Sequence, residues 1–256
     1  MQQALGLEPE HRLTVEAVSP AHSGLGSGTQ LALAVAAALR RFYGLPFDVR
    51  GDAERLGRGG RSGVGIGLFE QGGVVLDGGR TRESGPAPIL ARLPFPEDWR
   101  IVLVSDPAAA GIHGERELKA FADLPAFPQT LAAHLCHLVI LRMLPSLIEH
   151  DIRAFGSAVT EVQAVVGDWF SAAQGGRFAS PDVARVMDTL AGAGAHGIGQ
   201  SSWGPTGFTF AESEAEAERL VSRLEAARGA GSVTWQVVRG NNKGAAVVAR
   251  RVAAVA

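Results

Sequence analysis

The chain has 256 residues, of which 46% are hydrophobic and 20% charged, a composition typical of folded globular proteins and unlike that of disordered ones. Its formal net charge of −2 argues against general nucleic-acid binding, because such binding requires a basic surface. An anionic ligand would therefore need a local cluster of donors.

Two further features of the sequence concern the cellular compartment. The single cysteine, Cys136, lies in an apolar run and cannot form an internal disulfide, so we expect it to be buried in a protein of the reducing cytosol. The first residues, Met-Gln-Gln-Ala-Leu-Gly, lack the basic and apolar regions of a signal peptide. No uncharged segment has the length of a bilayer span. We therefore expect a cytoplasmic protein without a membrane partner.

The first predicted elements are a strand, a glycine-rich loop and a helix. Leu13, Val15 and Ala17 occupy alternate positions, which predicts a half-buried strand. Residues 19–29 follow with the sequence Ser-Pro-Ala-His-Ser-Gly-Leu-Gly-Ser-Gly-Thr. Apolar side chains then recur at helical spacing up to Gly44 and predict one buried helical face. They are Leu31, Ala34, Val35, Ala38, Leu39 and Phe42.

The glycine-rich loop has the physical properties of a phosphate-binding segment. Ser27 and Gln30 form the pattern of a capping box, which places the helix N-terminus directly after the glycines. That end of a helix presents unpaired N–H groups and a partial positive charge, and Gly24, Gly26 and Gly28 allow close backbone approach. The other interpretation is a tight turn that only connects a strand to a helix.

The following segment is predicted to contain little regular structure. Asp48 can cap a short helix, whereas residues 57–67 contain too many glycines for a helix or strand. Two short strands are expected, at residues 67–70 and 73–77. Residues 80–98 are rich in Arg, Pro and Gly and predict a surface connection.

The second half of the chain predicts helices between strands. Residues 99–105 are a continuous apolar run, which predicts a central strand and the start of a second domain. The leucines of residues 129–150 predict a long buried helix that is interrupted near Pro145, and a second helix follows through Phe170.

A second loop dense in Gly and Ser extends from Gly197 to Gly207. Helices and strands are predicted on both sides of it. These are a helix from Ser180-Pro181 to the glycines 192 and 194, a strand at 208–211, a capping-box helix from Ser213 to Arg228 and a strand at 233–238. The order of strands and helices is a split βαβ pattern of the α+β class.

The two glycine-rich loops resemble those of the GHMP kinase superfamily. Residues 20–28 are similar to its loop Pro-x-x-x-Gly-Leu-Gly-Ser-Ser, which holds phosphates between a strand and a helix, and the second loop falls where the superfamily has its C-terminal glycine-rich motif. The resemblance implies an α+β, GHMP-kinase-like fold of two domains. Residues 1–98 would form an N-terminal domain of the ribosomal-S5-domain-2-like type without its first strands, and residues 99–256 a ferredoxin-like split βαβ domain.

One feature of these kinases is missing from the sequence. They often carry a Pro-Ser-Gly-x-Asp segment, in which the Asp is the catalytic base towards the substrate hydroxyl. The matching residues here are Arg61-Ser62-Gly63-Val64-Gly65, so that glycine stands where the carboxylate would be. The resemblance therefore implies a phosphate-holding frame without the phosphotransfer chemistry.

Four segments are similar to those of one family in this superfamily, β-ribofuranosylaminobenzene 5′-phosphate synthase. They begin at Gly24, Arg61, Gln174 and Gly199, and the last reads Gly-Gln-Ser-Ser-Trp-Gly-Pro-Thr-Gly. Membership implies a glycosyltransferase that condenses phosphoribosyl pyrophosphate with 4-aminobenzoate or 4-hydroxybenzoate and releases pyrophosphate and CO2. The product would enter tetrahydromethanopterin biosynthesis, a part of one-carbon metabolism. An ATP-dependent small-molecule kinase and a non-catalytic ligand-binding subunit are the alternatives.

The resemblance implies that phosphate and substrate contacts come from three segments. The candidates are Gly24, Gly26, Ser27, Gly28 and Thr29 in the first loop, Arg61, Ser62 and Gly63 in the middle segment, and Gln200, Ser201, Ser202, Trp203, Gly204 and Thr206 in the second loop. Polar donors of the second loop suit either a phosphate or an aryl carboxylate. Trp203 is expected either to stack on the aromatic substrate or to pack in the core.

Three further residues are candidates for a catalytic role. His22 has the chemistry of an acid or base near neutral pH, although a structural role is the other interpretation. His113 and Glu115 lie in Gly-Ile-His-Gly-Glu-Arg-Glu, which resembles another family segment and would bind metal or substrate; an exposed helix start is the alternative.

The expected cofactor is Mg²⁺, bound with the pyrophosphate substrate, because the sequence contains no dedicated metal cage and the metal ligands are unknown. The expected partners are the small-molecule substrates, and a homodimer is possible.

Overall fold

The computed structural model describes residues 1, 3–7, 11–80, 85–109, 111–112, 114–226 and 232–249. The chain divides into two compact units. Unit 1 consists of Met1–Ser19, Gly26–Pro94 and Asn241–Ala256, and unit 2 consists of Pro20–Leu25 and Phe95–Gly240. The sequence predicts two continuous domains, whereas both units are assembled from separate segments of the chain.

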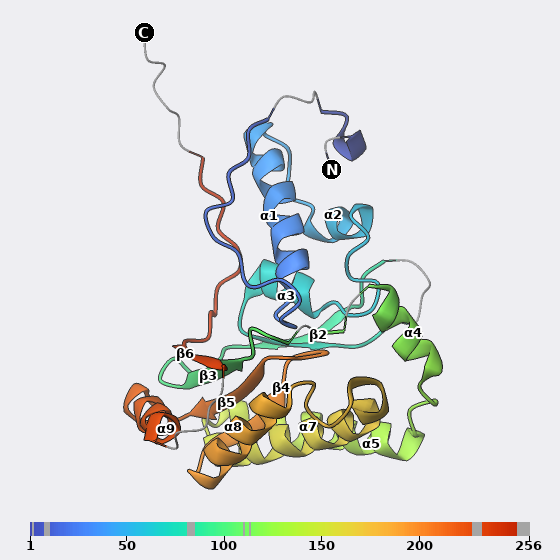
Figure 1. The fold of residues 1–256 in the computed structure, drawn as a ribbon. Coiled ribbons are helices and arrows are strands. Elements are labelled where there is room, and N and C mark those ends of the chain that lie inside the picture. Colours follow the sequence, from blue (N-terminus) through green and yellow to red (C-terminus); the bar gives the residue numbers. More distant parts are fainter. Residues whose placement is uncertain are drawn as a thin grey trace. The chain divides into compact units, whose positions relative to one another are not determined.

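Unit 1 contains helices and one small sheet (Figure 1). Its elements are η1 (Gln3–Leu5), α1 (Ser27–Phe42), α2 (Val49–Arg55), α3 (Val64–Gln71), β1 (Val74–Asp77) and β2 (Ile89–Leu93). β1 and β2 are antiparallel, with Val74 opposite Leu93. The three α-helices share a core of Leu33, Ala37, Ala53, Ile66 and Phe69.

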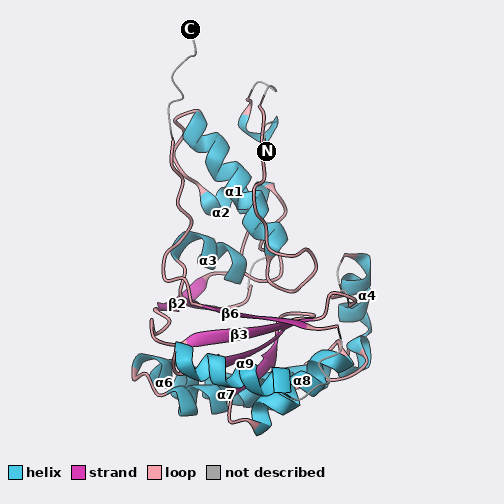
Figure 2. Ribbon diagram, turned by 60° about the vertical axis from the view of Figure 1, so that its left-hand side comes forward, coloured by secondary structure: helices cyan, strands magenta, loops and turns pink. Residues whose placement is uncertain are grey.

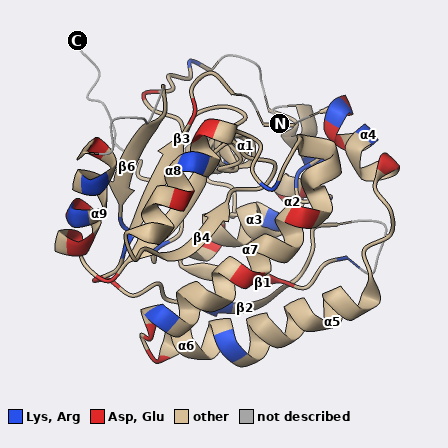
Figure 3. Ribbon diagram, turned by 60° about the horizontal axis from the view of Figure 1, so that its bottom comes forward, with Lys and Arg blue, Asp and Glu red and all other residues tan. Residues whose placement is uncertain are grey.

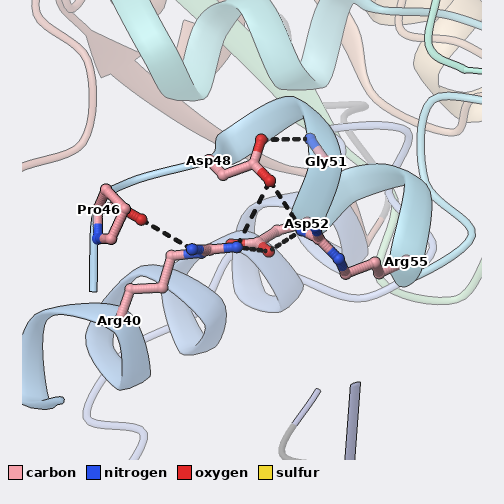
Figure 4. Close-up of polar contacts among 6 residues, drawn as sticks. All are labelled: Arg40, Pro46, Asp48, Gly51, Asp52 and Arg55. Atoms are coloured by element: carbon pink, nitrogen blue, oxygen red, sulfur yellow. Dashed lines mark hydrogen bonds and ion pairs between the residues drawn. The ribbon is translucent and has the colours of Figure 1, made fainter. Parts of the chain in front are cut away.

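A buried ion pair joins α1 to α2 (Figure 4). The Arg40 guanidinium is only 6% exposed and donates to both carboxylate oxygens of Asp52, at 2.5 and 2.7 Å, and to the Pro46 carbonyl at 2.8 Å. Arg55 donates to Asp52 and Asp48, and Asp48 caps α2 by accepting from the Gly51 amide, as predicted. Because each buried charge has several partners, the network fixes the position of α2 on α1.

Several predictions for unit 1 are wrong. Residues 11–19 contain no strand, and Leu13 and Val15 are exposed. Residues 67–70 belong to helix α3, because its buried residues Ile66 and Phe69 follow helical and not alternating spacing. The connection at residues 80–98 contains strand β2. Residues 67–70 pack in the core that α1, α2 and α3 share, and β2 pairs with β1, and the local pattern does not report either partner.

The predicted buried face of α1 is also different from the observed one. Leu39 is buried as expected, but Leu31 and Phe42 are exposed, and Phe42 retains 76% of its accessible surface. The helix instead buries Leu33, Ala36 and Ala37, together with Leu39 and Arg40. The pairing of Arg40 with Asp52 turns this face of the helix towards α2.

Unit 2 is an antiparallel sheet with helices on one side (Figure 2). Its elements are β3 (Arg100–Ser105), α4 (Glu115–Asp123), α5 (Gln129–Leu138), the π-helix η2 (Val139–Met143), α6 (Leu144–Ile148), α7 (Ile152–Gln174), α8 (Pro181–Gly192), β4 (His196–Gln200), β5 (Gly207–Ala211), α9 (Glu214–Ala226) and β6 (Thr234–Val238). The predicted strands at 99–105, 208–211 and 233–238 and the helix beginning at Ser180-Pro181 are confirmed.

The sheet has the strand order β4-β5-β3-β6. Val102 lies opposite Thr209 of β5 and Val237 of β6. Along the chain, helices α4 to α8 lie between β3 and β4, and helix α9 lies between β5 and β6. This is the predicted split βαβ arrangement. The core of this unit includes Val102 and Val104 of β3, Met187 and Leu190 of α8 and Leu220 of α9.

Strand β4 was not predicted, because Gly197 and Gly199 indicate a loop by composition. In the structure these glycines permit close packing. A Cβ on Gly197 would lie 2.6 Å from the Phe210 ring, and one on Gly199 would lie 2.5 Å from that of Phe208. The second loop is therefore shorter than predicted, and "second glycine loop" means residues 201–206 below. "First glycine loop" means residues 19–29.

The helical stretch Gln129–Ile148 is not the buried helix predicted from its leucines. Leu138 and Leu147 are buried, but Leu141 is 63% exposed, and Cys136 is exposed as well. The helix α5 carries no Lys, Arg, Asp or Glu (Figure 3). The stretch is long and apolar enough to cross a membrane by length and composition, with a mean hydropathy of 1.7. It contains Arg142, so the prediction that no uncharged segment has the length of a bilayer span does not concern it. The same composition occurs in helices of folded domains, so this observation alone does not assign a membrane.

Candidate functional site

The first glycine loop leads into α1, but not through the predicted capping box. Gly26 is the N-cap and has a left-handed φ of 71°, and no side chain caps the helix. The amides of Thr29 and Gln30 donate to the Gly26 carbonyl, and the Gln30 side chain donates to the Gly65 carbonyl at 2.7 Å. Ser27 is therefore the first helical residue. Its hydroxyl makes no hydrogen bond among the described residues and lies where a helix favours an anion.

Gly65, which the resemblance matches with the kinase base, packs directly on the start of α1. A Cβ at Gly65 would lie 3.2 Å from the Thr29 methyl group and 3.4 Å from its Cβ. An aspartate here would press against Thr29, and glycine permits the close approach of α3 to α1. The contact gives a structural reason for the missing carboxylate in the middle segment.

Ser62 and Gly63 are held by a carboxylate that the sequence did not single out. Asp77 accepts from the Ser62 hydroxyl at 2.6 Å and from the Gly63 amide at 2.8 Å through one oxygen, and from the Gly79 amide through the other. These bonds fix the start of α3, so the Ser62 side chain supports the fold of unit 1. The exposed Arg61 lies next to this anchor.

Arg58 lies nearer to the first glycine loop than its place in the sequence indicates. A Cβ at Gly28 would be 3.5 Å from the Arg58 Nη1 atom. The Arg58 side chain is exposed, and no hydrogen bond or ion pair holds it among the described residues. Residues 50–61 contain four arginines, at positions 50, 55, 58 and 61, and only the tertiary structure distinguishes Arg58 from the others. Unit 1 thus places a guanidinium, the Ser27 hydroxyl and a helix N-terminus together, which is a chemistry suited to phosphate.

In unit 2, residues 20–25 pack against the second glycine loop. The Ser201 hydroxyl donates to the Ser23 carbonyl at 2.9 Å. A Cβ at Gly24 would overlap the Ser201 side chain and lie 2.5 Å from the Ser202 carbonyl oxygen. The structure therefore brings together two segments that are about 180 residues apart in sequence.

A third segment joins them at Gly111. Its amide donates to the His22 carbonyl at 3.1 Å. A Cβ here would overlap the Gly204 carbonyl and lie 2.8 Å from that of Trp203. His22 itself is exposed and has a left-handed φ of 58°. Glu115 is exposed in the first turn of α4, and His113 lies outside the described residues, so their catalytic roles stay predictions.

The second glycine loop is closed by its own backbone. The Ser201 amide donates to the Thr206 carbonyl, and the Gly204 amide donates to the Ser201 carbonyl, both at 2.8 Å. Thr206 is completely buried, and its hydroxyl lies 3.4 Å from that of Ser105. Trp203 is 8% exposed and makes edge contacts with Phe170 and Phe121, with ring centroids 4.4 and 5.2 Å apart. These contacts agree with the interpretation of Trp203 as a core residue.

The segment from Gln174 to Ser180, which resembles a family segment, lies beside this loop. Arg177 donates two hydrogen bonds of 2.8 Å to Asp168 and so holds the pKa of that carboxyl below its usual value. Gln200 accepts from the Ala179 amide at 2.6 Å. Among the described residues, no group of three or more His, Cys, Asp or Glu side chains is arranged to hold a metal ion.

Family models match both parts of the chain. The model for the GHMP kinases N-terminal domain matches residues 1–70, and the model for the GHMP kinases C-terminal domain matches residues 143–230. Solved structures share the fold. A homoserine kinase of Cytophaga hutchinsonii has a TM-score of 0.61 with 19% identity, covering 88% of this chain and 68% of that chain. The mevalonate kinase of L. major has a TM-score of 0.60 with 18% identity, covering 85% and 67%. The predicted GHMP-kinase-like α+β fold is confirmed.

Three curated proteins are similar in sequence, and each is named beta-ribofuranosylphenol 5′-phosphate synthase. The protein of Methanothermobacter thermautotrophicus is 33% identical over 95% of this chain and 75% of its own length. That of Archaeoglobus fulgidus is 38% identical over 78% of this chain and 65% of its own length. That of Methanocaldococcus jannaschii is 35% identical over 59% of this chain and half of its own length.

Proposed function

Because the chain belongs to the β-ribofuranosylphenol 5′-phosphate synthase family, a family of enzymes, we propose that it is a decarboxylating phosphoribosyltransferase. Its donor would be phosphoribosyl pyrophosphate and its acceptor 4-hydroxybenzoate or 4-aminobenzoate. The observation that carries the proposal is the 33% identity to a named synthase over 95% of the chain. Since this chain spans 75%, 65% and 50% of the three relatives, its own activity requires a direct test.

The proposed reaction exchanges two bonds at one ring carbon. The bond from ribose C1 to pyrophosphate breaks, and a bond from C1 to the carboxyl-bearing ring carbon forms. The bond to the carboxylate then breaks, and its electron pair returns to the ring as CO2 leaves. No ring proton is needed, because the ribosyl group takes the place of the carboxylate. Electron release from the para hydroxyl or amino group makes the ring carbon nucleophilic.

The residues of the site supply binding and electrostatics in this proposal. In unit 1, the N-terminus of α1, the Ser27 hydroxyl and the Arg58 guanidinium would bind a phosphate group of the donor. In unit 2, the second glycine loop would bind an anionic group of a substrate. Mg²⁺, when bound, would neutralise the leaving pyrophosphate. Since the described residues contain no cluster of metal ligands, we derive no step through a protein-bound ion.

The acceptor follows from the chemistry of the product. A ribofuranosylphenol carries a hydroxyl on the ring, so the relatives' name favours 4-hydroxybenzoate over 4-aminobenzoate as acceptor. With the reaction we also propose a place in tetrahydromethanopterin biosynthesis and a cytoplasmic location, both of which rest on membership of the family. A homodimer also stays a prediction, and sedimentation of the purified chain would test it.

The experiment is incubation with phosphoribosyl pyrophosphate, Mg²⁺ and either benzoate labelled at the carboxyl carbon. We expect pyrophosphate and labelled CO2 in equal amounts, and faster release with 4-hydroxybenzoate. Pyrophosphate without CO2 would indicate hydrolysis of the donor and contradict the proposal. A parallel incubation with ATP and a metabolite alcohol tests the kinase alternative, against which the glycine at position 65 argues. Binding of both substrates without any product would support a ligand-binding subunit.

A further inference from the structure

The polar side chains of the second glycine loop and its flanking strand differ in what they contact. Those of Gln200, Ser201 and Thr206 contact other parts of unit 2. The Ser202 side chain is exposed and makes no hydrogen bond among the described residues. All four polar residues were predicted as substrate contacts, but in the structure only the Ser202 side chain is without a hydrogen bond to the described residues.

Gln200 uses its side chain to hold the loop. Its Oε1 atom accepts from the Ala179 amide at 2.6 Å, and its Nε2 atom donates to Gln174 Oε1 at 3.3 Å. A Cβ at Gly204 would lie 2.8 Å from Gln200 Oε1, which shows that this amide lies directly against the turn of the loop. Its backbone amide donates to Gln163 on α7. Both polar atoms of the side chain are therefore used inside the protein.

The segment to which Gln200 is bonded is itself anchored. Gln174 donates to the Arg177 carbonyl at 2.9 Å, and Arg177 pairs with Asp168 on α7. At the other end, the buried Ser180 hydroxyl donates to Asp106 at the end of β3 and accepts from the Val183 amide in α8. The Gln200 side chain thus connects the second glycine loop to a segment that is fixed on three elements.

Ser202 has the opposite environment. Its carbonyl oxygen lies against Gly24, so the residue is located where residues 20–25 meet the second glycine loop. Ser201 donates to the Ser23 carbonyl and so keeps these backbones together. An exposed hydroxyl at this junction is available to an oxyanion, whereas its neighbours are not.

We propose that Gln200 is a positioning residue that sets the second glycine loop through the Ala179 amide, and that Ser202 is the side chain of this loop that binds the substrate. The ligand class is an oxyanion, either a phosphate group of the donor or the carboxylate of the acceptor. The assignment of these two ligands rests on the proposed function. The contact through Ser202 and the positioning through Gln200 rest on the geometry of unit 2.

The test is calorimetric binding of phosphoribosyl pyrophosphate, inorganic pyrophosphate and 4-hydroxybenzoate, each titrated separately. Ser202→Ala should weaken one ligand class about tenfold, as expected for one lost hydrogen bond to a charged group, without changing the melting temperature. Loss with both phosphate ligands identifies a phosphate contact, and loss with the benzoate identifies a carboxylate contact. Ser222→Ala, an exposed serine on α9, is the matched control. Unchanged affinity for all three ligands in Ser202→Ala overturns its assignment.

Gln200 is tested by its effect on the Ala179 amide. Gln200→Met removes both polar atoms and should raise hydrogen exchange at Ala179 at least tenfold, while weakening binding of the ligands that Ser202 contacts. Gln200→Glu keeps the acceptor for Ala179 but loses the donor to Gln174 while it is ionised. We expect this variant to regain affinity as the pH is lowered and the carboxyl is protonated, at an unchanged melting temperature, which separates positioning of the loop from a general effect on stability. Gln236→Met, at an exposed position of β6, is the control.

The outcomes separate this inference from the proposed function. Weaker binding in the variants of a protein that releases no CO2 supports the inference and contradicts the proposed reaction. Normal exchange at Ala179 and normal binding in Gln200→Met overturn the positioning role, even when the enzyme is active. Binding of none of the three ligands by the unaltered protein overturns both.

Discussion

The two glycine-rich loops have similar compositions but different structures. The first glycine loop opens a helix in unit 1, and Gly26 at its N-cap has no atom within 4 Å of where a Cβ would be. The second glycine loop joins strands β4 and β5 of unit 2, and a Cβ at Gly204, or at Gly207 where β5 begins, would meet neighbours within 3 Å. Glycine thus serves conformation alone at Gly26, whereas Gly204, with a left-handed φ of 55°, serves both conformation and packing.

Gly24 does not follow this difference between the two loops. It is part of the first glycine loop by sequence, but it belongs to unit 2 and packs on Ser201 and Ser202. A residue's role in these loops therefore follows from the unit in which it packs and not from the motif to which it belongs.

The largest expected effect concerns the anchor of the helix that follows the first glycine loop. Arg40→Met should destabilise unit 1 by about 3–5 kcal/mol, because it leaves the buried Asp52 carboxylate without its main partner. All four tryptophans lie in unit 2, so tryptophan fluorescence in urea follows unit 2 and circular dichroism follows both units. We expect an early transition by circular dichroism only. Arg41→Met, on the exposed side of α1, should leave both transitions unchanged, and one coincident shift would mean that the units unfold together.

The next prediction compares two glycines with left-handed backbone. Gly26→Ala should cost roughly 1–2 kcal/mol, since strain at φ 71° is its only penalty. Gly24→Ala adds overlap with Ser201 and Ser202, and we expect about 3 kcal/mol or more. Urea unfolding by both probes measures the difference. Equal effects of the two substitutions would show that the packing of Gly24 contributes nothing.

A smaller effect is expected at the N-terminus of α1, where we propose that phosphate binds. Arg58→Ala should weaken binding of phosphoribosyl pyrophosphate about tenfold, because a guanidinium beside Gly28 is lost. The loss should decrease at high salt, where exposed charges are screened. Calorimetry at two salt concentrations provides the measurement. Arg61→Ala is the comparison, and a larger loss at Arg61 would favour the prediction made from the sequence.

The smallest effects are expected on acidification. Hydrogen bonds from Arg55 and from the Gly51 amide lower the pKa of Asp48 in unit 1, and Arg177 lowers that of Asp168 in unit 2. A lowered carboxyl pKa stabilises the folded state above the unfolded pKa of about 4, and this stability is lost as the pH falls through the folded value. Asp48→Asn should reduce the acid sensitivity of unit 1, and Asp168→Asn that of unit 2.

Acid titrations with the same two probes distinguish the units. The Asp168→Asn change should appear in tryptophan fluorescence, and the Asp48→Asn change in circular dichroism alone. Both carboxylates are exposed, so the differences will be small. Identical acid transitions in the two variants and the unaltered protein would show that neither Asp48 with Arg55 nor Asp168 with Arg177 stabilises the folded state.

Much of unit 2 could be predicted from the sequence because its signals are local. The Ser180 cap, the apolar run at 100–105 and the alternation at 234–238 each report the element in which they lie. Unit 1 was predicted less well. Residues 64–71 form a helix because Asp77 accepts from the Gly63 amide and Phe69 packs against core residues of α1 and α2. Asp77 and these core residues all lie outside the segment.

The sequence by itself determined the family, the α+β fold class and the two segments that form the candidate site, because motif order and spacing are written in the chain. Tertiary structure alone decided which side chains in those segments are available. The side chains of Gln200, Ser201 and Ser62 form hydrogen bonds with Ala179, Ser23 and Asp77, respectively. The side chains of Ser27, Arg58 and Ser202 form no hydrogen bond among the described residues. A hydrogen bond between residues far apart in the chain cannot be read from the sequence around either residue. Only the folded chain therefore distinguishes a side chain that is available to a ligand from one that has a structural role.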